Sequence, residues 1–205
     1  LIIIIFVMNI INNTSKDQLK HEFDKSRVLI EDYLEMQKHE TKHVGDVILK
    51  TIEDDPIISS TLKNNDRDAL FKRFKPLYDS IFKNNKISHL SFIKPNKEVL
   101  LRVHKPDHYG DVLDRSTILE AKKTGKVTEG IESGPDGLLT YRVVEPYYNN
   151  GELLGYIEIG KDLPHILDEA KEFLNMDFNL YLYNKAFDVN LVSNTLKKLQ
   201  HIFVY

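Results

Sequence analysis

The 205-residue chain contains no cysteine, which excludes disulfides, thiolate catalysis, cysteine-based zinc sites and covalent haem attachment of the c type. It also lacks an excess of positive charge. With a net charge of −3 there is no basic footprint, so no nucleic-acid partner is expected. Hydrophobic residues make up 41% of the chain and charged residues 29%, a composition typical of folded globular proteins. The length suffices for one core and part of a second.

Most signatures of enzymes and cofactor sites are absent as well. The sequence has no P-loop, no nucleophile elbow and no dinucleotide-binding fingerprint. Six of the eight histidines form no set with the spacing of metal ligands. We therefore predict no cofactor, no metal site and no enzymatic activity in this region.

One enzyme motif is present and has to be weighed. Residues 39–43 read HETKH, matching H-E-x-x-H, in which two histidines bind zinc and the glutamate is the general base. Lys42 would place positive charge beside the metal, and no third ligand stands at a suitable spacing. We interpret the motif as a solvated helix face. The alternative function, a zinc metalloprotease-like enzyme, would use His39, Glu40 and His43.

The longest apolar run is at the N-terminus. Residues 1–11 read LIIIIFVMNII, whereas a membrane-spanning helix needs about 20 apolar residues. Because the sequence does not begin with Met, we interpret residues 1–14 as the end of a transmembrane helix that starts before Leu1. A buried strand or core helix is the alternative.

A long stalk helix is predicted over residues 15–55. Between Ser15 and Ile52 there is no proline, and the only glycine is Gly45. At ~1.5 Å per residue this segment would span roughly 57 Å, too long for the internal helix of a small domain. Apolar residues recur at multiples of three, four or seven. They are Leu19, Phe23, Ile30, Leu34, Val44, Ile48 and Ile52.

Residues 56–161 are predicted to form an α+β module. A second amphipathic helix is expected up to Phe82, with Asp66 as its cap. A capping box of Thr117 and Glu120 predicts a short helix inserted between the second and third strands. The long N-terminal helix would pack on the resulting five-stranded antiparallel sheet. Alternating apolar residues and turn signals place the strands at residues 87–93, 98–104, 127–131, 138–147 and 153–159.

The remaining residues, 162–205, contain too few strand signals to form a sheet of their own. An amphipathic helix is predicted over 163–174, a strand over 177–183 and a final helix over 189–200. We interpret this tail as a connecting helix followed by the truncated start of a second module.

Three runs of the chain carry a resemblance to a known family. Residues 100–117 read LLRVHKPDHYGDVLDRST, residues 130–146 read GIESGPDGLLTYRVVEP, and residues 151–160 read GELLGYIEIG. Together they resemble the double-Cache domains, PAS-like sensors outside the cytoplasm in bacterial transmembrane receptors. These receptors include chemoreceptors, sensor histidine kinases and diguanylate cyclases. One departure is Ile93, where the family often has histidine.

The resemblance implies an architecture and a function. Residues 56–161 would be the membrane-distal Cache module, which binds a small molecule on the extracytoplasmic or periplasmic side. The chain would be anchored in the inner (cell) membrane and would form a homodimer through its long helix. Ligand binding would shift the flanking helices and so signal to a cytoplasmic output domain.

Polar side chains of the module supply a candidate ligand site. An arginine on a half-buried strand needs an acceptor, and its guanidinium fork matches a carboxylate, so the ligand is expected to be anionic. Alternatively, the arginines pair with Asp111, Asp114, Glu129, Glu132 or Glu145 as a framework, and the module is structural or binds a protein. The predicted ligand-binding residues are Arg102, His104, Tyr109, Asp111, Arg115 and Arg142.

Overall fold

The computed structural model describes residues 2–5, 16–82, 84–134, 137–175, 179–182 and 202–204. The chain divides into two compact units. The first, here called the sheet unit, comprises Glu40–Glu132 and Thr140–Asp162. The second, here called the terminal unit, comprises Leu1–His39, Ser133–Leu139 and Leu163–Tyr205.

The predicted long helix is confirmed as α1, Lys16–Glu53, and it contributes residues to both units. In the sheet unit, the buried apolar side chains of α1 are those of Ile48, Leu49 and Ile52. Gly45 lies against the sheet, because a Cβ atom placed on it would be 2.3 Å from Cδ1 of Ile159. The only glycine of α1 therefore sits where the helix packs closely on the sheet.

Three short helices follow in the sheet unit. They are α2 (Ile58–Lys63), α3 (Arg67–Leu77) and the π-helix η1 (Tyr78–Phe82). Asp66 caps α3 as predicted, with its carboxylate accepting a hydrogen bond from the backbone N–H of Ala69 at 3.0 Å. The rings of Phe74 and Phe92 pack 5.1 Å apart and join α3 to the sheet.

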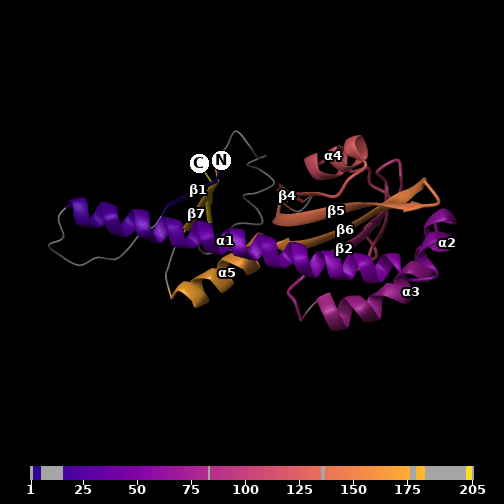
Figure 1. Cartoon of the computed structure of the whole chain (residues 1–205), viewed down its shortest axis with the longest axis horizontal. Helices are drawn as coiled ribbons and strands as arrows, with labels where there is room; N and C mark the ends of the chain where they lie inside the picture. The colour runs from indigo at the N-terminus through magenta and orange to yellow at the C-terminus, as the bar shows by residue number, and fades with distance from the viewer. Residues whose placement is uncertain are drawn as a thin grey trace. The chain divides into compact units, whose positions relative to one another are not determined.

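The predicted α+β fold with a five-stranded sheet is confirmed. The strands are β2 (His89–Ile93), β3 (Val99–Arg102), β4 (Thr128–Ser133), β5 (Leu139–Asn149) and β6 (Glu152–Asp162). Their order is β3-β2-β6-β5-β4, and the β2–β3, β2–β6 and β5–β6 pairs are antiparallel. Figure 1 shows α3 on one side of this sheet and α4 (Ser116–Thr124) on the other.

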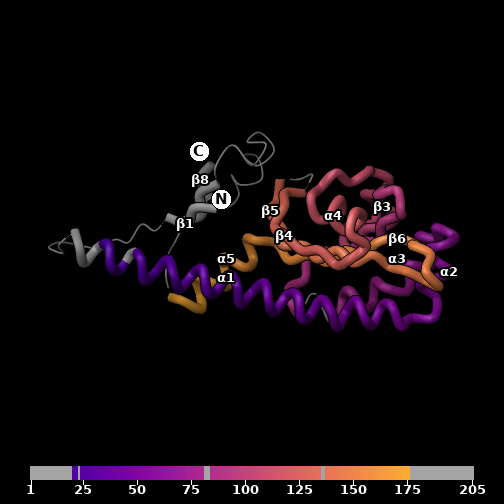
Figure 2. The backbone as a smooth tube through the Cα atoms, turned by 45° about the horizontal axis from the view of Figure 1, so that its top comes forward, coloured from indigo at the N-terminus to yellow at the C-terminus, as the bar shows by residue number. Residues whose placement is uncertain are grey.

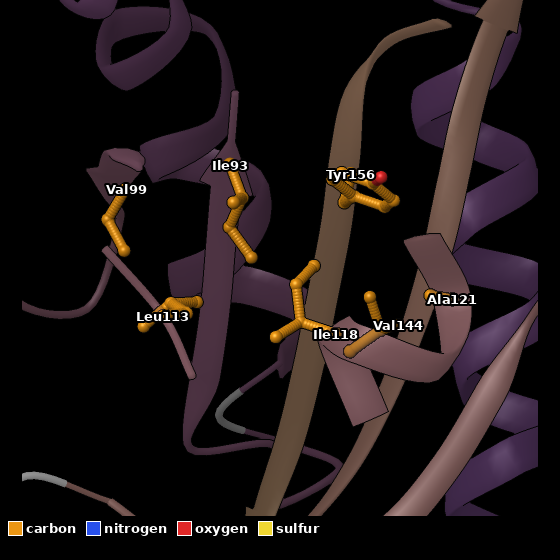
Figure 3. Close-up of a cluster of buried hydrophobic side chains, with 7 residues drawn as sticks. All are labelled: Ile93, Val99, Leu113, Ile118, Ala121, Val144 and Tyr156. Carbon is orange, nitrogen blue, oxygen red and sulfur yellow. The ribbon is translucent and has the colours of Figure 1, made fainter. Parts of the chain in front are cut away.

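The segment between β3 and β4, which carries α4, curls over one side of the sheet (Figure 2). We call the covered side the insert face. Its apolar half is a buried cluster that α4 and the preceding loop pack against (Figure 3). Side chains alternate along a strand, so Ser91 shares a face with Ile93 on β2, and Glu158 shares a face with Tyr156 on β6. The insert face therefore has a polar end as well as an apolar one. The cluster consists of Ile93, Val99, Leu113, Ile118, Ala121, Val144 and Tyr156.

The predicted capping box at the start of α4 is wrong. The N-cap position belongs to Arg115, whose backbone is extended and whose side chain makes no cap hydrogen bond. Thr117 lies inside the helix, and its N–H is taken by the carboxylate of Glu132 on β4. A tertiary contact thus replaces the local pairing of Thr117 with Glu120. At the other end, Gly125 ends α4 in the left-handed conformation that favours glycine.

The terminal unit contains a three-stranded sheet of order β1-β7-β8, made from both ends of the chain. Its strands are β1 (Ile2–Ile5), β7 (Asn179–Leu182) and β8 (Ile202–Val204). The predicted helix over 163–174 is confirmed as α5, Leu163–Leu174. The ring of Tyr33 on α1 lies 5.3 Å from that of Phe173 on α5.

Within residues 1–14 the structure differs from the helical end predicted there. Ile2–Ile5 form a strand paired with β7, in keeping with the strand preference of β-branched residues. In the described part of the chain, no helix combines the length and apolar character needed to cross a bilayer. The final helix predicted over 189–200 lies outside the described residues.

Candidate ligand-binding site

Two arginines converge on one glutamate at the polar end of the insert face. Glu158 on β6 receives Nη2 of Arg115 at 2.5 Å on one carboxylate oxygen and Nη1 of Arg142 at 3.0 Å on the other. Arg142 lies on β5, and Arg115 immediately precedes α4. The side chains of Arg142 and Glu158 are 3% exposed and that of Arg115 is 14% exposed, so all three charges are withdrawn from water. We call these three residues the central cluster.

The central cluster keeps its charges. Burial favours the neutral form of Glu158, but Arg142 and Arg115 outweigh it and hold the pKa of this carboxyl below its ordinary value. Burial also lowers the pKa of Arg142, and Glu158 opposes this shift. A guanidinium remains protonated near neutral pH because its ordinary pKa is so high. The cluster is therefore two cations sharing one anion.

Both arginines retain an unused donor. The Nε–H groups of Arg115 and Arg142 are buried and make no hydrogen bond within the part of the chain that the structure describes. A buried donor without an acceptor costs about 1–3 kcal/mol. A ligand oxygen placed against these groups would remove that cost.

Two histidines lie near the central cluster. Nδ1 of His104 lies 3.2 Å from the backbone oxygen of Leu90, and the rings of His89 and His104 are 4.3 Å apart in an edge-on arrangement. Burial lowers the pKa of His104 to about 4. Burial, with Arg142 as the next cause, also lowers the pKa of His89. Both rings are neutral at neutral pH, so they offer hydrogen bonds without adding charge.

Arg102 and Asp111 form a bidentate pair of their own. Nη1 and Nη2 of Arg102 lie 2.7 and 2.8 Å from the two carboxylate oxygens of Asp111. Nη1 of Arg102 also donates to the backbone oxygen of His108 at 2.9 Å. The side-chain hydrogen bonds from Arg102 lower the pKa of Asp111. These contacts join the loop that precedes α4 to β3. The Arg102–Asp111 pair is one of the framework ion pairs that the alternative interpretation names.

Tyr109 lies on the outside of the same loop. Its residue is 57% exposed, and its ring packs under the guanidinium of Arg67 at 4.1 Å. Arg67 also donates to the backbone oxygen of Pro106. The structure therefore places Tyr109 on the loop surface, packed against Arg67.

The structure thus divides the six predicted residues. Arg115 and Arg142 meet through Glu158, Arg102 pairs with Asp111, and His104 lies beside His89, while Tyr109 is separate. Glu158 is not among the site residues predicted from the sequence. The sequence does contain a signal for Glu158, because it is a single charged residue between Ile157 and Ile159 on a predicted strand. Alternation places Glu158 on the face opposite those two isoleucines.

The H-E-x-x-H motif gains no support from the structure. His39, Glu40 and His43 are all exposed on α1. Among the described residues, no group of three or more histidine or acidic side chains is arranged to hold a metal ion.

The model of a family described as the double sensory domain of two-component sensor kinases, a double-Cache family, matches residues 13–201. The chain belongs to this family, as the resemblance predicted. Membership of a sensory family agrees with the prediction that this region is not an enzyme.

Solved structures of sensor domains share the fold. The Escherichia coli DcuS sensor domain is 18% identical with a TM-score of 0.50, and the match covers 65% of this chain and 97% of that one. The sensor domain of the Vibrio cholerae histidine kinase DctB is 15% identical with a TM-score of 0.53. That match covers 75% of this chain and 61% of the Vibrio domain. No curated protein sequence matches the chain significantly.

Proposed function

We propose that this chain is the extracytoplasmic sensing region of a bacterial transmembrane receptor and that it binds a small anionic molecule at the central cluster. The observation that carries the proposal is the pair of buried Nε–H donors of Arg115 and Arg142, which find no acceptor among the described residues. Perturbed, buried charges that converge in this way are typical of functional sites. Neither a metal nor a cofactor is part of the proposal.

An anionic group suits these donors for geometric reasons. The Nε–H of an arginine and one of its Nη–H groups form a fork that matches the two oxygens of a carboxylate. Glu158 occupies Nη atoms of both arginines, which leaves an Nε–H of each for a second acceptor. Burial strengthens such a contact, because the local dielectric constant is far below that of water. His104 would add a neutral hydrogen-bonding partner at the same end of the insert face.

The other three predicted residues have a supporting part in this proposal. The Arg102–Asp111 pair fixes the loop that leads to Arg115, and Tyr109 packs on the outside of that loop with Arg67. These residues would hold the insert in place over the site, while Arg115, Arg142 and His104 contact the ligand.

The first test is stabilisation by small carboxylates. Acetate, succinate and the common amino acids would be titrated into the protein while its thermal unfolding is followed. A ligand at 100 times its Kd adds about 2.7 kcal/mol to the free energy of unfolding. Arg142→Lys keeps the charge but removes the guanidinium fork. We therefore expect this variant to bind the stabilising carboxylate with an apparent affinity at least about tenfold lower than that of the wild type.

The matched control is Arg73→Lys. Arg73 also pairs with a carboxylate, that of Asp55 at 2.6 Å, but it lies on α3 and its side chain is 57% exposed. Its variant should bind like the wild type. Equal binding by Arg142→Lys and the wild type would contradict the proposed site, and the absence of binding by any of these compounds would contradict the anionic ligand.

Signalling requires a difference between two states. The ligand must bind one arrangement of the surrounding elements better than the other, since equal affinity for both shifts nothing. In the proposed receptor, the change passes through the flanking helices to an output domain, such as a kinase or cyclase, in the cytoplasm.

We further propose a parallel homodimer through α1. Leu29, Met36 and Val47 are exposed apolar residues of this helix, spaced so that they fall on one side of it. Sedimentation equilibrium is expected to show dimers of the wild type and a loss of dimer in Leu29→Glu and Met36→Glu. A monomer at all concentrations of the wild type would contradict the dimer but not the ligand site.

A further inference from the structure

One contact of the insert has the character of a ligand contact, although both partners belong to the chain. The carboxylate of Glu132 receives the backbone N–H of Thr117 on one oxygen and the hydroxyl of Thr117 on the other, both at 2.7 Å. Thr117 lies in the first turn of α4, where backbone N–H groups have no helical partner. A side-chain carboxylate is thus bound at the positive end of the helix dipole.

The strand that supplies Glu132 lies flat against Thr117. Thr128 donates its hydroxyl proton to the backbone oxygen of Thr117 at 2.7 Å. A Cβ atom on Gly130 would lie 3.3 Å from Cγ2 of Thr117. Thr128, Gly130 and Glu132 alternate along β4, so they share one face, and together they hold this edge strand to α4.

The same helix end lies beside the central cluster. Arg115 is the residue that precedes α4, and it directs its guanidinium at Glu158. Arg142 is 3% exposed, and its Nε–H makes no hydrogen bond in the described part of the chain. Its guanidinium also interacts electrostatically with the carboxylate of Glu132. Burial lowers the pKa of Arg142, and the charge of Glu132 is one of those that oppose this shift. Two arginines and a helix N-terminus therefore already interact with two carboxylates of the chain itself.

We propose that Glu132 is an internal competitor: it holds the N–H and hydroxyl of Thr117 until an anionic ligand, bound at the Nε–H groups of Arg115 and Arg142, displaces it from this helix end. The inference rests on the proposed function, because it assumes an anion at Arg115 and Arg142. Displacement of Glu132 would leave Thr117 to the ligand and would release the edge strand β4 from α4. The competition would set the ligand concentration to which the sensor responds.

Glu132 is the carboxylate that a ligand can replace, and Glu158 is not. Glu158 is 2% exposed on a strand with neighbours on both sides, and its removal would leave two buried guanidinium groups without an anion. Glu132 is half-buried on an edge strand, and the hydrogen bonds that it accepts from Thr117 come from neutral groups. Moving Glu132 into water costs far less free energy than moving Glu158, because water solvates the carboxylate of Glu132 and no buried cation is left without a counterion.

The test is the affinity of Glu132→Gln for acetate and succinate. Glutamine has nearly the same shape and still accepts the N–H of Thr117, but it carries no charge to compete with the ligand. We expect the Kd of the carboxylate that binds the wild type to fall about tenfold, within the usual range of coupling between sites. Isothermal titration calorimetry measures the change directly.

Two control variants separate competition from other effects. Glu129→Gln removes a carboxylate of the same strand that pairs with Lys42 on α1 at 2.9 Å, and it should leave the Kd unchanged. Thr128→Val removes the other hydrogen bond between β4 and Thr117 without changing the charge. If Thr128→Val tightens binding as much as Glu132→Gln does, a loosened strand is the cause and the competitor proposal is overturned.

The remaining outcomes distinguish this inference from the proposed function. Binding that depends on Arg142 but is unchanged or weakened in Glu132→Gln would overturn the internal competitor and leave the ligand site intact. Binding that does not depend on Arg142, or no binding in either protein, would overturn both.

Discussion

The variant Glu158→Gln is expected to lose about 3–5 kcal/mol of its free energy of unfolding. The substitution keeps the shape of the side chain but removes the anion that both buried guanidinium groups, of Arg115 and Arg142, contact. Desolvated charges without a counterion are among the most costly defects in a folded protein. Urea unfolding of the wild type and the variant at neutral pH measures the difference.

An exposed acidic residue provides the comparison for Glu158. Glu129 forms an ion pair with Lys42 in which both side chains are more than two fifths exposed. Exposed pairs contribute about 0–1 kcal/mol, so Glu129→Gln should unfold almost like the wild type. Should Glu158→Gln prove equally mild, the charged central cluster described above would be wrong.

The variant Gly155→Ala is expected to lose about 2–3 kcal/mol, comparable to severe overpacking of a core. A Cβ atom on Gly155 would lie 2.4 Å from the backbone oxygen of Ile93 on β2. Backbone cannot turn aside as the end of a side chain can, so β2 and β6 would have to separate where Ile93 pairs with Tyr156. Thermal unfolding should show a clear decrease in the midpoint temperature.

Gly151 is the matched control for Gly155. It lies in the turn between β5 and β6 with φ +81°, and a Cβ atom there would meet nothing within 4 Å. Gly151→Ala should cost only the strain of a left-handed alanine, about 1–2 kcal/mol. A larger loss in Gly151→Ala than in Gly155→Ala would show that turn strain outweighs strand spacing here.

The elements of the sheet unit could be predicted because their signals are local. The apolar period of α1 is regular, and alternation bounded by Gly, Pro and Asn marks the strands. The start of α4 differs from the prediction because Thr117 and Glu120 match a local pattern, whereas the partner of Thr117 is Glu132. A contact fifteen residues away along the chain leaves no local signal.

The candidate site was partly predictable for the same reason. Alternation identified Arg142 as a buried arginine that needs an acceptor, and the insert supplied Arg115. The shared acceptor, Glu158, depends on the register between β5 and β6, where Val144 lies opposite Glu158. Register cannot be read from one strand alone, because a shift by one residue exchanges the two faces. Pairing of Ile2–Ile5 with β7 escaped prediction because it joins the two ends of the chain.

The central claim is that the Nε–H groups of Arg115 and Arg142 receive the anionic group of a small ligand. The most direct measurement is an NMR titration of arginine side-chain Nε–H signals with the carboxylate that stabilises the protein. We expect the signals of Arg115 and Arg142 to shift with saturation while that of Arg73 stays in place. Saturable binding that leaves the signals of Arg115 and Arg142 unchanged would contradict the claim and place the ligand elsewhere.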